Sequence, residues 1–377
     1  MKEKNGRLLS LDVLRGFDMS FIMGGEVVLI CLASLFPGLK FLGEQMGHSQ
    51  WDGFTFYDLI FPLFLFLAGI SFPFSMAKQL SLGKSRGSIS LKVVKRGMIL
   101  VLLGVVYNGL LQFDFETLRY ASVLGRIGLA WMFASLLYIW LKRKWLLALL
   151  SAVILLGYWA LLALVVAPDA PDGASSFSME GSIVGYVDRY FLPGALHNEI
   201  HDPEGLLSTL PAIVTAMLGI FTGEFVRSKS FANEYKKVLL MLGAATVLLA
   251  AGYLWDITFP INKNLWSSSF VCCAGGWSLL LFALFYLVVD VLQWRNWAFP
   301  FRVIGMNSIT IYLAQQFLDF GKPVNTLFGG LLKSLPEDYY ALGWWCCYML
   351  VCWCLLYFLY RKNLFLKVLF RVTCKIG

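Results

Sequence analysis

Long apolar runs recur from end to end of this 377-residue chain, and they restrict its fold more than any other feature. One helical crossing of a bilayer takes about 20 mostly apolar residues. A crossing in contact with lipid must satisfy its backbone hydrogen bonds within itself, so each run is predicted to be a helix. The runs cover residues 14–36, 54–77, 92–112, 121–141, 145–167, 206–226, 237–256, 265–291, 298–318 and 340–360. The predicted fold is all-α, a polytopic integral membrane helical bundle of about ten transmembrane helices.

Charged side chains are too few to cover a surface in water. They make up 14% of the residues, against about a quarter in soluble domains, and the mean hydropathy is +0.71. Most of the 31 Lys and Arg residues fall on one side when the runs are threaded alternately through a membrane. By the positive-inside rule this side is cytoplasmic, and both chain termini lie on it. The net charge of +8 then suits anionic lipid and requires no nucleic acid.

The opposite side carries the longest connection and all three histidines, His48, His197 and His201. That connection, residues 168–205, is rich in Asp and Glu and long enough to fold over the outer mouth of the bundle as a lid. No separate soluble region stands out, so residues 1–377 are expected to form one domain that contains this extracytoplasmic loop. The few histidines, and cysteines that lie in or beside apolar runs without metal spacing, predict no metal site.

The stretch "GHSQWDGFTFYDLIFPLFLFLAGISF" places His48 a few residues before the second run. A histidine can act as a base or a nucleophile near neutral pH. His48 is therefore a candidate catalytic residue at the depth where water meets hydrocarbon. An ordinary interfacial histidine is the alternative, and Trp51 fits an interfacial anchor.

Two carboxylates, Glu26 and Asp58, lie inside the first two runs. Ionisable groups within a membrane are costly and by default indicate a functional site. Glu26 lies about 16 Å along the first helix from Arg15, which places it in the outer half of the bilayer. Both carboxylates belong to helices joined by the loop of His48, so they could converge on it. The alternative is a structural role, which we favour for Asp58, for instance in holding Arg126.

Asp202 and Glu204 precede the sixth run in "HDPEGLLSTLPAI". Together they could bind a cationic amino sugar. Helix capping explains them as well, with Asp202 as the N-cap, Pro203 at the first helical position and Glu204 at the positive end of the helix.

Polar and aromatic residues crowd the start of the eighth run in "INKNLWSSSF", which holds Asn262, Lys263, Asn264 and Trp266. Amides suit the hydroxyl groups of a sugar and an indole suits its face, so this stretch is a candidate sugar site. An interfacial aromatic belt is the alternative for Trp266.

Three further polar residues lie in apolar surroundings. "GMNSITIY" puts Asn307 and Ser308 inside the ninth run, where they could bind a ligand or hold helices together. "LGRIGL" surrounds Arg126 with apolar neighbours, where its guanidinium could bind a phosphate or a carboxylate.

Six stretches occur here in the order typical of one family. They are "SLDVLRGFDM", "HSQWDGFTFYDLIFPLFLFLAG", "LGRIGL", "HDPEGLLSTLPAIVTAMLGIFTG", "INKNLWSSSF" and "GMNSITIYL". With them the chain resembles the heparan-alpha-glucosaminide N-acetyltransferase family over nearly its whole length, and it looks like a bacterial member of the inner (cytoplasmic) membrane. The resemblance implies a transmembrane acyltransferase that moves acetyl from cytoplasmic acetyl-CoA to the amine of a glucosamine-type sugar on the other side. It also implies a membrane homodimer.

The family's active histidine lies in an H-x-x-W-x-G stretch, which corresponds here to His48, Trp51 and Gly53. Two positions depart from the family pattern. Asp52 stands where the family often has asparagine, and Glu26 stands where an asparagine is expected in the first span. A carboxylate beside His48 could raise its basicity, or it could signal a different acceptor or a lost activity.

With this reaction in view, each candidate residue has an expected role. His48 is expected to act as general base or to take the acetyl group itself, and Glu26 to orient it or stabilise its charge. Acetyl-CoA is expected to contact Arg15, Arg126, Asn307 and Ser308. The expected acceptor site consists of Trp51, Asp52, Asp202, Glu204, Asn262, Lys263, Asn264 and Trp266.

Two other functions stay open at this point. Polar residues midway through apolar helices suit an amino-sugar transporter, although the sequence shows no internal repeat of the kind that transporters often have. A non-catalytic membrane protein would tolerate replacement of His48. The residues themselves do not identify the acceptor sugar, and they do not choose between direct transfer and an acetyl-histidine intermediate.

Overall fold

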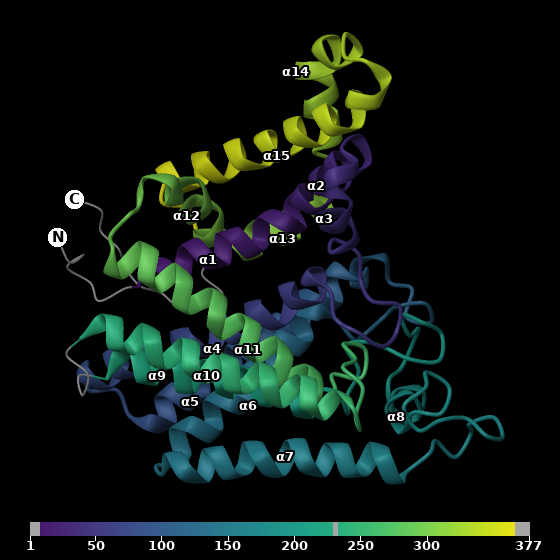
Figure 1. Ribbon diagram of the computed structural model, residues 1–377, viewed down its shortest axis with the longest axis vertical. Helices are drawn as coiled ribbons and strands as arrows, with labels where there is room; N and C mark the ends of the chain where they lie inside the picture. Colours follow the sequence, from purple (N-terminus) through teal and green to yellow (C-terminus); the bar gives the residue numbers. More distant parts are fainter. Residues whose placement is uncertain (1–7, 229–232, 366–377) are drawn as a thin grey trace. The chain divides into compact units, whose positions relative to one another are not determined.

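The computed structural model describes residues 8–228 and 233–365 of the chain (Figure 1). Over this part the chain forms helices α1 to α15, with short 3-10 and π-helical segments between some of them. The extended pairings in these residues are two isolated bridges, Arg119 with Gly194 and Val166 with Ser182. The predicted all-α class is therefore confirmed for the described residues.

Within residues 8–228 and 233–365, eight helical stretches are long and apolar enough to cross a membrane. They match eight of the predicted runs. They are Leu9–Leu35, which joins α1 (Leu9–Ser20), the π-helical η1 (Phe21–Gly25) and α2 (Glu26–Leu35); α4 (Phe56–Ser81); α6 (Val123–Trp140); α7 (Lys144–Leu164); α9 (Thr209–Arg227); α10 (Glu234–Asp256); Ser268–Val291, which joins α11 (Ser268–Phe285) and η4 (Tyr286–Val291); and α15 (Glu337–Arg361).

The other two predicted runs fold differently. Run 92–112 corresponds to α5 (Arg86–Tyr107), whose first half carries Lys92, Lys95 and Arg96. Run 298–318 is divided at Asn307 into α12 (Phe299–Met306) and α13 (Ser308–Phe317). The count of about ten crossings and the cytoplasmic orientation of the termini stay predictions, since both chain ends lie outside the described residues.

The chain forms two compact units that are interleaved in the sequence. The first contains the described residues up to His48, then Thr55–Ile60, then the residues from Leu281 onward. The second contains Ser49–Phe54 and Phe61–Leu280. The expectation of one acyltransferase domain over residues 1–377 stays a prediction.

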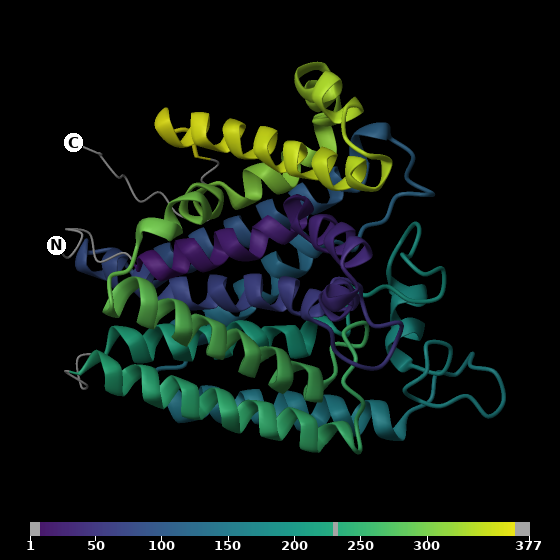
Figure 2. The same cartoon turned by 45° about the horizontal axis from the view of Figure 1, so that its top comes forward.

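In the first unit α1 packs closely along α12. Gly16 makes this approach possible, because a Cβ atom there would lie 1.7 Å from the carbonyl oxygen of Phe301. Asp290 in η4 accepts the backbone N–H groups of Leu9 and Ser10, at 3.3 and 3.1 Å, and so caps the start of α1. Helix α15 packs against α2 and against α14 (Gly321–Lys333), which lies at one end of α15 (Figures 1 and 2).

The second unit is built around α6 and α9. Helix α6 packs along α5 and against α9, and α9 also packs against α7, which lies at the margin of this unit in Figure 1. Small residues let α4 and α9 approach each other, since a Cβ atom at Gly219 would lie 2.1 Å from the carbonyl oxygen of Phe66.

The 168–205 connection is an ordered part of the second unit. It contains the short helix α8 (Ile183–Phe191), and the side chain of Ser182 caps this helix by accepting the N–H of Val184 at 3.2 Å. Backbone bridges hold the connection to the second unit at Val166 and at Arg119. Its role as a lid stays a prediction.

Candidate active site

His48 and Asp58 form a hydrogen-bonded pair in the first unit. Nδ1 of His48 lies 2.8 Å from Oδ1 of Asp58. The Asp58 side chain is fully buried, whereas the His48 side chain is 51% exposed. An ionised carboxylate can only accept, so Nδ1 of His48 donates this hydrogen bond. Such a pair has the arrangement of a general base supported by a carboxylate.

The start of α4 holds Asp58 in place. Its Oδ2 accepts the N–H of Thr55 at 3.2 Å and lies 3.0 Å from the hydroxyl group of Thr55. A carboxylate in the first turn of a helix is also favoured by the helix dipole. Both oxygens of Asp58 are therefore used, one by His48 and one by Thr55.

Gln45 and Tyr57 support the loop that contains His48. Gln45 lies just after α3 (Lys40–Glu44); its side-chain Oε1 accepts the N–H of Phe56 at 3.0 Å, and its carbonyl accepts the N–H of Tyr57 at 3.1 Å. The rings of His48 and Tyr57 lie 4.8 Å apart. These contacts tie the loop to α4 and restrict the position of the imidazole.

Glu26 lies close enough to His48 for their charges to interact. It begins α2 directly after η1, a π-helical turn in which Gly24 has a φ of 116°. Such turns inside helices often occur at functional sites. Within the described residues, Oε2 of Glu26 is shielded from solvent and has no hydrogen-bond partner. The structure therefore brings Glu26 and Asp58 to His48, the convergence that the sequence analysis considered.

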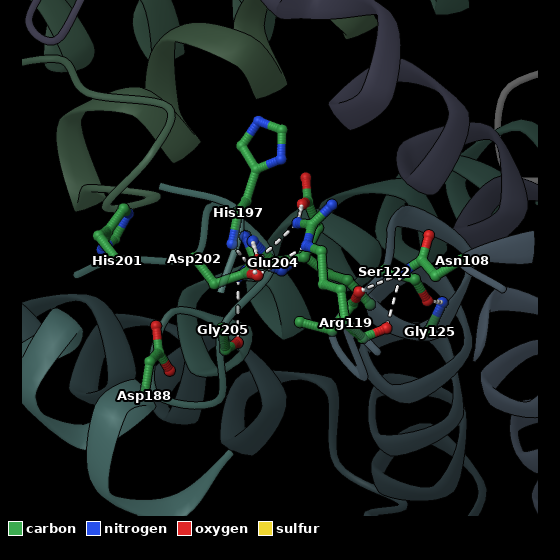
Figure 3. A network of polar contacts seen from close by, with 12 residues as sticks. Asn108, Arg119, Ser122, Gly125, Asp188, His197, His201, Asp202, Glu204 and Gly205 are labelled. Atoms are coloured by element: carbon green, nitrogen blue, oxygen red, sulfur yellow. Dashed lines mark hydrogen bonds and ion pairs between the residues drawn. The ribbon is translucent and has the colours of Figure 1, made fainter. Parts of the chain in front are cut away.

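A second polar cluster lies in the second unit, around Arg119 (Figure 3). The guanidinium of Arg119 donates to both oxygens of Asp202, at 2.7 and 2.6 Å, and also to Glu204. Asp202 further accepts the backbone N–H groups of His197 at 3.1 Å and Glu204 at 2.9 Å. The positive charge of Arg119 thus already balances Asp202 and Glu204, the carboxylate pair that the sequence analysis considered as a site for a cationic amino sugar.

These contacts act on the ionisation of the cluster. Burial opposes the charge of Asp202, but the hydrogen bonds and charge of Arg119 hold the pKa of that carboxyl below its usual value. The two carboxylates in turn raise the pKa of Arg119 despite its burial. The capping alternative for Asp202 is wrong, because α9 begins only at Thr209 and its N-cap residue is Ser208.

Two further ionisable groups of the second unit are buried with shifted pKa values. Burial raises the pKa of Asp188 to about 7, although its Oδ1 accepts the N–H of Leu206 at 2.8 Å. Burial lowers the pKa of His201 to about 4. Nε2 of His201 lies 3.2 Å from the carbonyl oxygen of Asn264, so the neutral ring donates from Nε2 and leaves Nδ1 as an acceptor.

The segment Ser49–Phe54 follows His48 directly and is bound within the second unit. Trp51 donates from its indole to the carbonyl of Phe177 at 2.8 Å, and its ring contacts His201 edge to face at 5.4 Å. Asp52 accepts a hydrogen bond from the Asn262 side chain at 3.1 Å. Four residues of the predicted acceptor site, Trp51, Asp52, Asn262 and Asn264, are therefore joined through contacts of this segment.

Trp266 and Arg126 form another part of the second unit. Trp266 is only 1% exposed, so an exposed aromatic belt does not describe it. Its indole donates to the hydroxyl of Thr215 at 3.2 Å, and the Arg126 guanidinium lies 5.0 Å from its ring. Arg126 also donates to the carbonyl of Gly205 at 3.1 Å and to the hydroxyl of Ser208. The carbonyl of Lys263 accepts the N–H of Trp266 at 3.1 Å, in the turn that precedes α11.

The residues predicted to contact acetyl-CoA lie on different elements. Arg15 is on α1, 3.7 Å from Asp12, and Asn307 and Ser308 lie buried at the break between α12 and α13. Within the described residues neither side-chain polar atom of Asn307 has a hydrogen-bond partner. Arg126 belongs to the second unit. Their role in binding acetyl-CoA stays a prediction.

The sequence analysis missed Arg119, Asp188 and Gln45. Arg119 lies in the short connection between the runs 92–112 and 121–141, and nothing in the sequence pairs it with Asp202. No group of three or more His, Cys, Asp or Glu side chains that could hold a metal ion occurs in the described part of the chain.

Two curated proteins are similar to this chain. Heparan-alpha-glucosaminide N-acetyltransferase of Homo sapiens is 27% identical in an alignment 421 residues long, which covers 96% of this chain and 60% of that protein. The protein of the same name from Mus musculus is 27% identical over 376 residues, covering 85% of this chain and 56% of that protein. The chain thus spans about three fifths of the length of these relatives, and no family model matches it.

These matches support membership of the chain in the heparan-alpha-glucosaminide N-acetyltransferase family. Together with the eight apolar helices they support a multi-pass membrane protein.

Proposed function

Taking membership in this family as the premise, we propose that the protein is a transmembrane N-acetyltransferase of the bacterial inner membrane. It transfers acetyl from cytoplasmic acetyl-CoA to the amine of a glucosamine-type sugar on the extracytoplasmic side. The observation that carries the proposal is the 2.8 Å hydrogen bond between His48 Nδ1 and Asp58 Oδ1, which holds a half-exposed imidazole on a fully buried carboxylate.

The chemistry follows from this arrangement. The amine nitrogen attacks the thioester carbonyl carbon, a C–N bond forms and the C–S bond breaks. Nε2 of His48 takes a proton from the attacking nitrogen and returns it to the departing sulfur, which leaves as the thiol of CoA. Asp58 stabilises the imidazolium that forms in between, as a buried carboxylate does in hydrolase triads. If His48 takes the acetyl group first, its Nε2 attacks the thioester carbonyl carbon and the C–S bond breaks, releasing CoA as the thiolate. The amine then attacks the acetyl carbon, the bond from that carbon to Nε2 breaks, and the amine proton passes to the thiolate, while Asp58 again stabilises the positive charge on the ring.

The binding roles belong to the same proposal. Polar and aromatic groups of the second unit, from the Asp52–Asn262 pair to Trp266, supply the hydrogen bonds and ring faces that a sugar needs. Asn262, Asn264 and Asn307 can donate to sugar hydroxyls or to the oxyanion. Arg15, Arg126, Asn307 and Ser308 are the proposed contacts of acetyl-CoA. A membrane homodimer stays a prediction of the family resemblance.

Sealed vesicles containing the full chain test the two-sided reaction. Labelled acetyl-CoA is added to the side of the membrane that is cytoplasmic in the cell, and glucosamine is enclosed on the other side. The proposal expects labelled N-acetylglucosamine on the glucosamine side and free CoA on the side of addition. Product on the acetyl-CoA side alone would contradict a transmembrane transfer.

The transporter alternative has its own outcome in the same vesicles. A carrier would move labelled glucosamine across the membrane without acetyl-CoA, and the sugar would remain unmodified. The half-exposed imidazole on a buried carboxylate favours the enzyme, because sugar transport does not require a base in that state.

A further inference from the structure

The proposed reaction removes two protons from the acceptor nitrogen, so it needs a second proton acceptor besides His48, either water before binding or a side chain in the site. An amino sugar is mostly an ammonium ion at neutral pH, and its nitrogen must lose two protons to become an amide. One of them passes through His48 to the sulfur of CoA. The other must leave earlier, because an ammonium nitrogen has no lone pair with which to attack the thioester.

Asp58 is not available for this proton. Its side chain is fully buried, and its two oxygens are engaged by His48 and by Thr55. Asp58 therefore holds His48 in position, which also removes the need for Glu26 to orient the ring. The role that the sequence analysis gave to Glu26 is thus already filled by another carboxylate.

Glu26 has the properties that the second base needs. Its charge interacts with His48, so it lies within the same site of the first unit. Its Oε2 has no hydrogen-bond partner among the described residues, and a shielded carboxylate oxygen without a partner is destabilising until a donor reaches it. The residue as a whole is only half-buried, so its side chain is not fully enclosed by the protein.

We propose that Glu26 binds the acceptor as an ammonium ion and takes the proton that turns it into an attacking amine. The inference rests on the proposed acetyl transfer and assigns its acceptor to cationic primary amines. The N–H bond breaks, its electron pair stays on nitrogen, and the proton binds to the carboxylate of Glu26. After acylation the neutral amide has no charge to hold, so it leaves, and Glu26 returns its proton to water.

Glu26 stands where the family resemblance leads one to expect asparagine. A neutral amide at that position can form a hydrogen bond with an amine but can neither balance its charge nor accept its proton. The carboxylate therefore makes this chain more selective for charged amines than an asparagine would.

The test compares wild type, Glu26→Gln and Glu26→Asp as full chains in detergent. Glucosamine and glucose differ in one ammonium group, so their binding in the absence of acetyl-CoA isolates the contact with Glu26. We expect wild type to bind glucosamine more tightly than glucose, and Glu26→Gln to lose about 10- to 100-fold of that preference. Glu26→Asp, which keeps the charge, should retain most of it. An unchanged preference in Glu26→Gln overturns the proposal.

Acetylation kinetics give the second measurement. Glu26→Gln should raise the KM for glucosamine about 10-fold or more while the KM for acetyl-CoA stays unchanged. Glu44→Gln is the matched control, because Glu44 is an exposed carboxylate of the same unit and pairs with Lys40 at 3.8 Å. An equal rise in Glu44→Gln would contradict a specific role for Glu26.

The two proposals fail separately. If wild type binds glucosamine through Glu26 but forms no N-acetylglucosamine, the acetyl transfer is wrong and the ammonium site stands. If wild type forms the product and Glu26→Gln keeps both the binding preference and the KM, the transfer stands and the ammonium site is wrong. Should Glu26→Gln fail to fold, Glu26→Asp decides between the outcomes. This variant keeps the charge, so if it folds and still loses the preference for glucosamine over glucose, charge recognition is contradicted.

Discussion

Arg119 donates two hydrogen bonds to Asp202 across 83 residues of sequence, at 2.7 and 2.6 Å. The contact fixes the segment before α6 to the segment before α9 within the second unit (Figure 3). It also neutralises a carboxylate that is completely buried. Asp202 is therefore first a structural residue, and any contribution to acceptor binding depends on Arg119.

Replacement of Arg119 by methionine should destabilise the protein by up to about 3 kcal/mol, because it leaves Asp202 buried without its counter-ion. Thermal melting of the detergent-purified chain measures the effect. Arg189→Met is the matched control, since Arg189 pairs with Asp169, a half-exposed carboxylate, and should cost no more than about 1 kcal/mol. Equal losses in the two variants would contradict the account, and Asp202→Asn added to Arg119→Met should restore part of the stability.

Asp188→Asn should stabilise the protein at high pH. Burial raises the pKa of Asp188 to about 7, from 3.8 in the unfolded chain. The folded protein therefore keeps a proton that the unfolded chain has lost, so its stability falls as the pH rises from about 4 to about 7. Asparagine carries no charge and can still accept the N–H of Leu206. The melting temperature of the variant should exceed that of wild type above pH 7, and the gain should disappear toward pH 4; a gain independent of pH would contradict this.

His201→Gln should show a pH dependence of stability opposite in sign to that of Asp188→Asn. Burial lowers the pKa of His201 to about 4 from 6.5, so its contribution to stability is present above pH 6.5 and is lost as the pH falls through about 4. The stability of wild type relative to the variant should thus be constant above pH 6.5 and shrink below it. Asp188 and His201 change the stability of the protein with pH in opposite directions. Their effects partly cancel in wild type, so each single variant is more informative than the dependence of wild-type stability on pH. A difference that grows on acidification would show that His201 is charged when folded.

Asp58→Asn should lower kcat by at least about 100-fold, because the amide cannot stabilise an imidazolium on His48. The KM for acetyl-CoA should stay the same, which separates loss of chemistry from loss of binding. Asp338→Asn is the control, since Asp338 is an exposed residue in the first turn of α15. A raised KM with an unchanged kcat would assign Asp58 to binding.

Much of the helical arrangement could be predicted from the sequence, because a membrane-spanning run carries its own signal. The run 54–77 became α4 and the run 145–167 became α7, with boundaries shifted by a few residues. The division of the ninth run at Asn307 could not be predicted, since the apolar residues on both sides hide a break that depends on one polar position.

The candidate site could be predicted where a residue is unusual for its surroundings. His48 stood out because it precedes an apolar run, and Glu26 and Asp58 stood out because carboxylates are costly inside one. The partners of Arg119 and Asp188 could not be predicted, because their contacts join segments far apart in the sequence and no local pattern encodes them.

The formation of N-acetylglucosamine from acetyl-CoA and glucosamine by the purified chain tests the central claim most directly. Wild type should form the product with one CoA released per amide, and His48→Ala should form it at least about 1,000-fold more slowly. His197→Ala should remain active, because the exposed side chain of His197 has no role in the proposed chemistry. Equal rates in wild type and a folded His48→Ala variant would contradict the account.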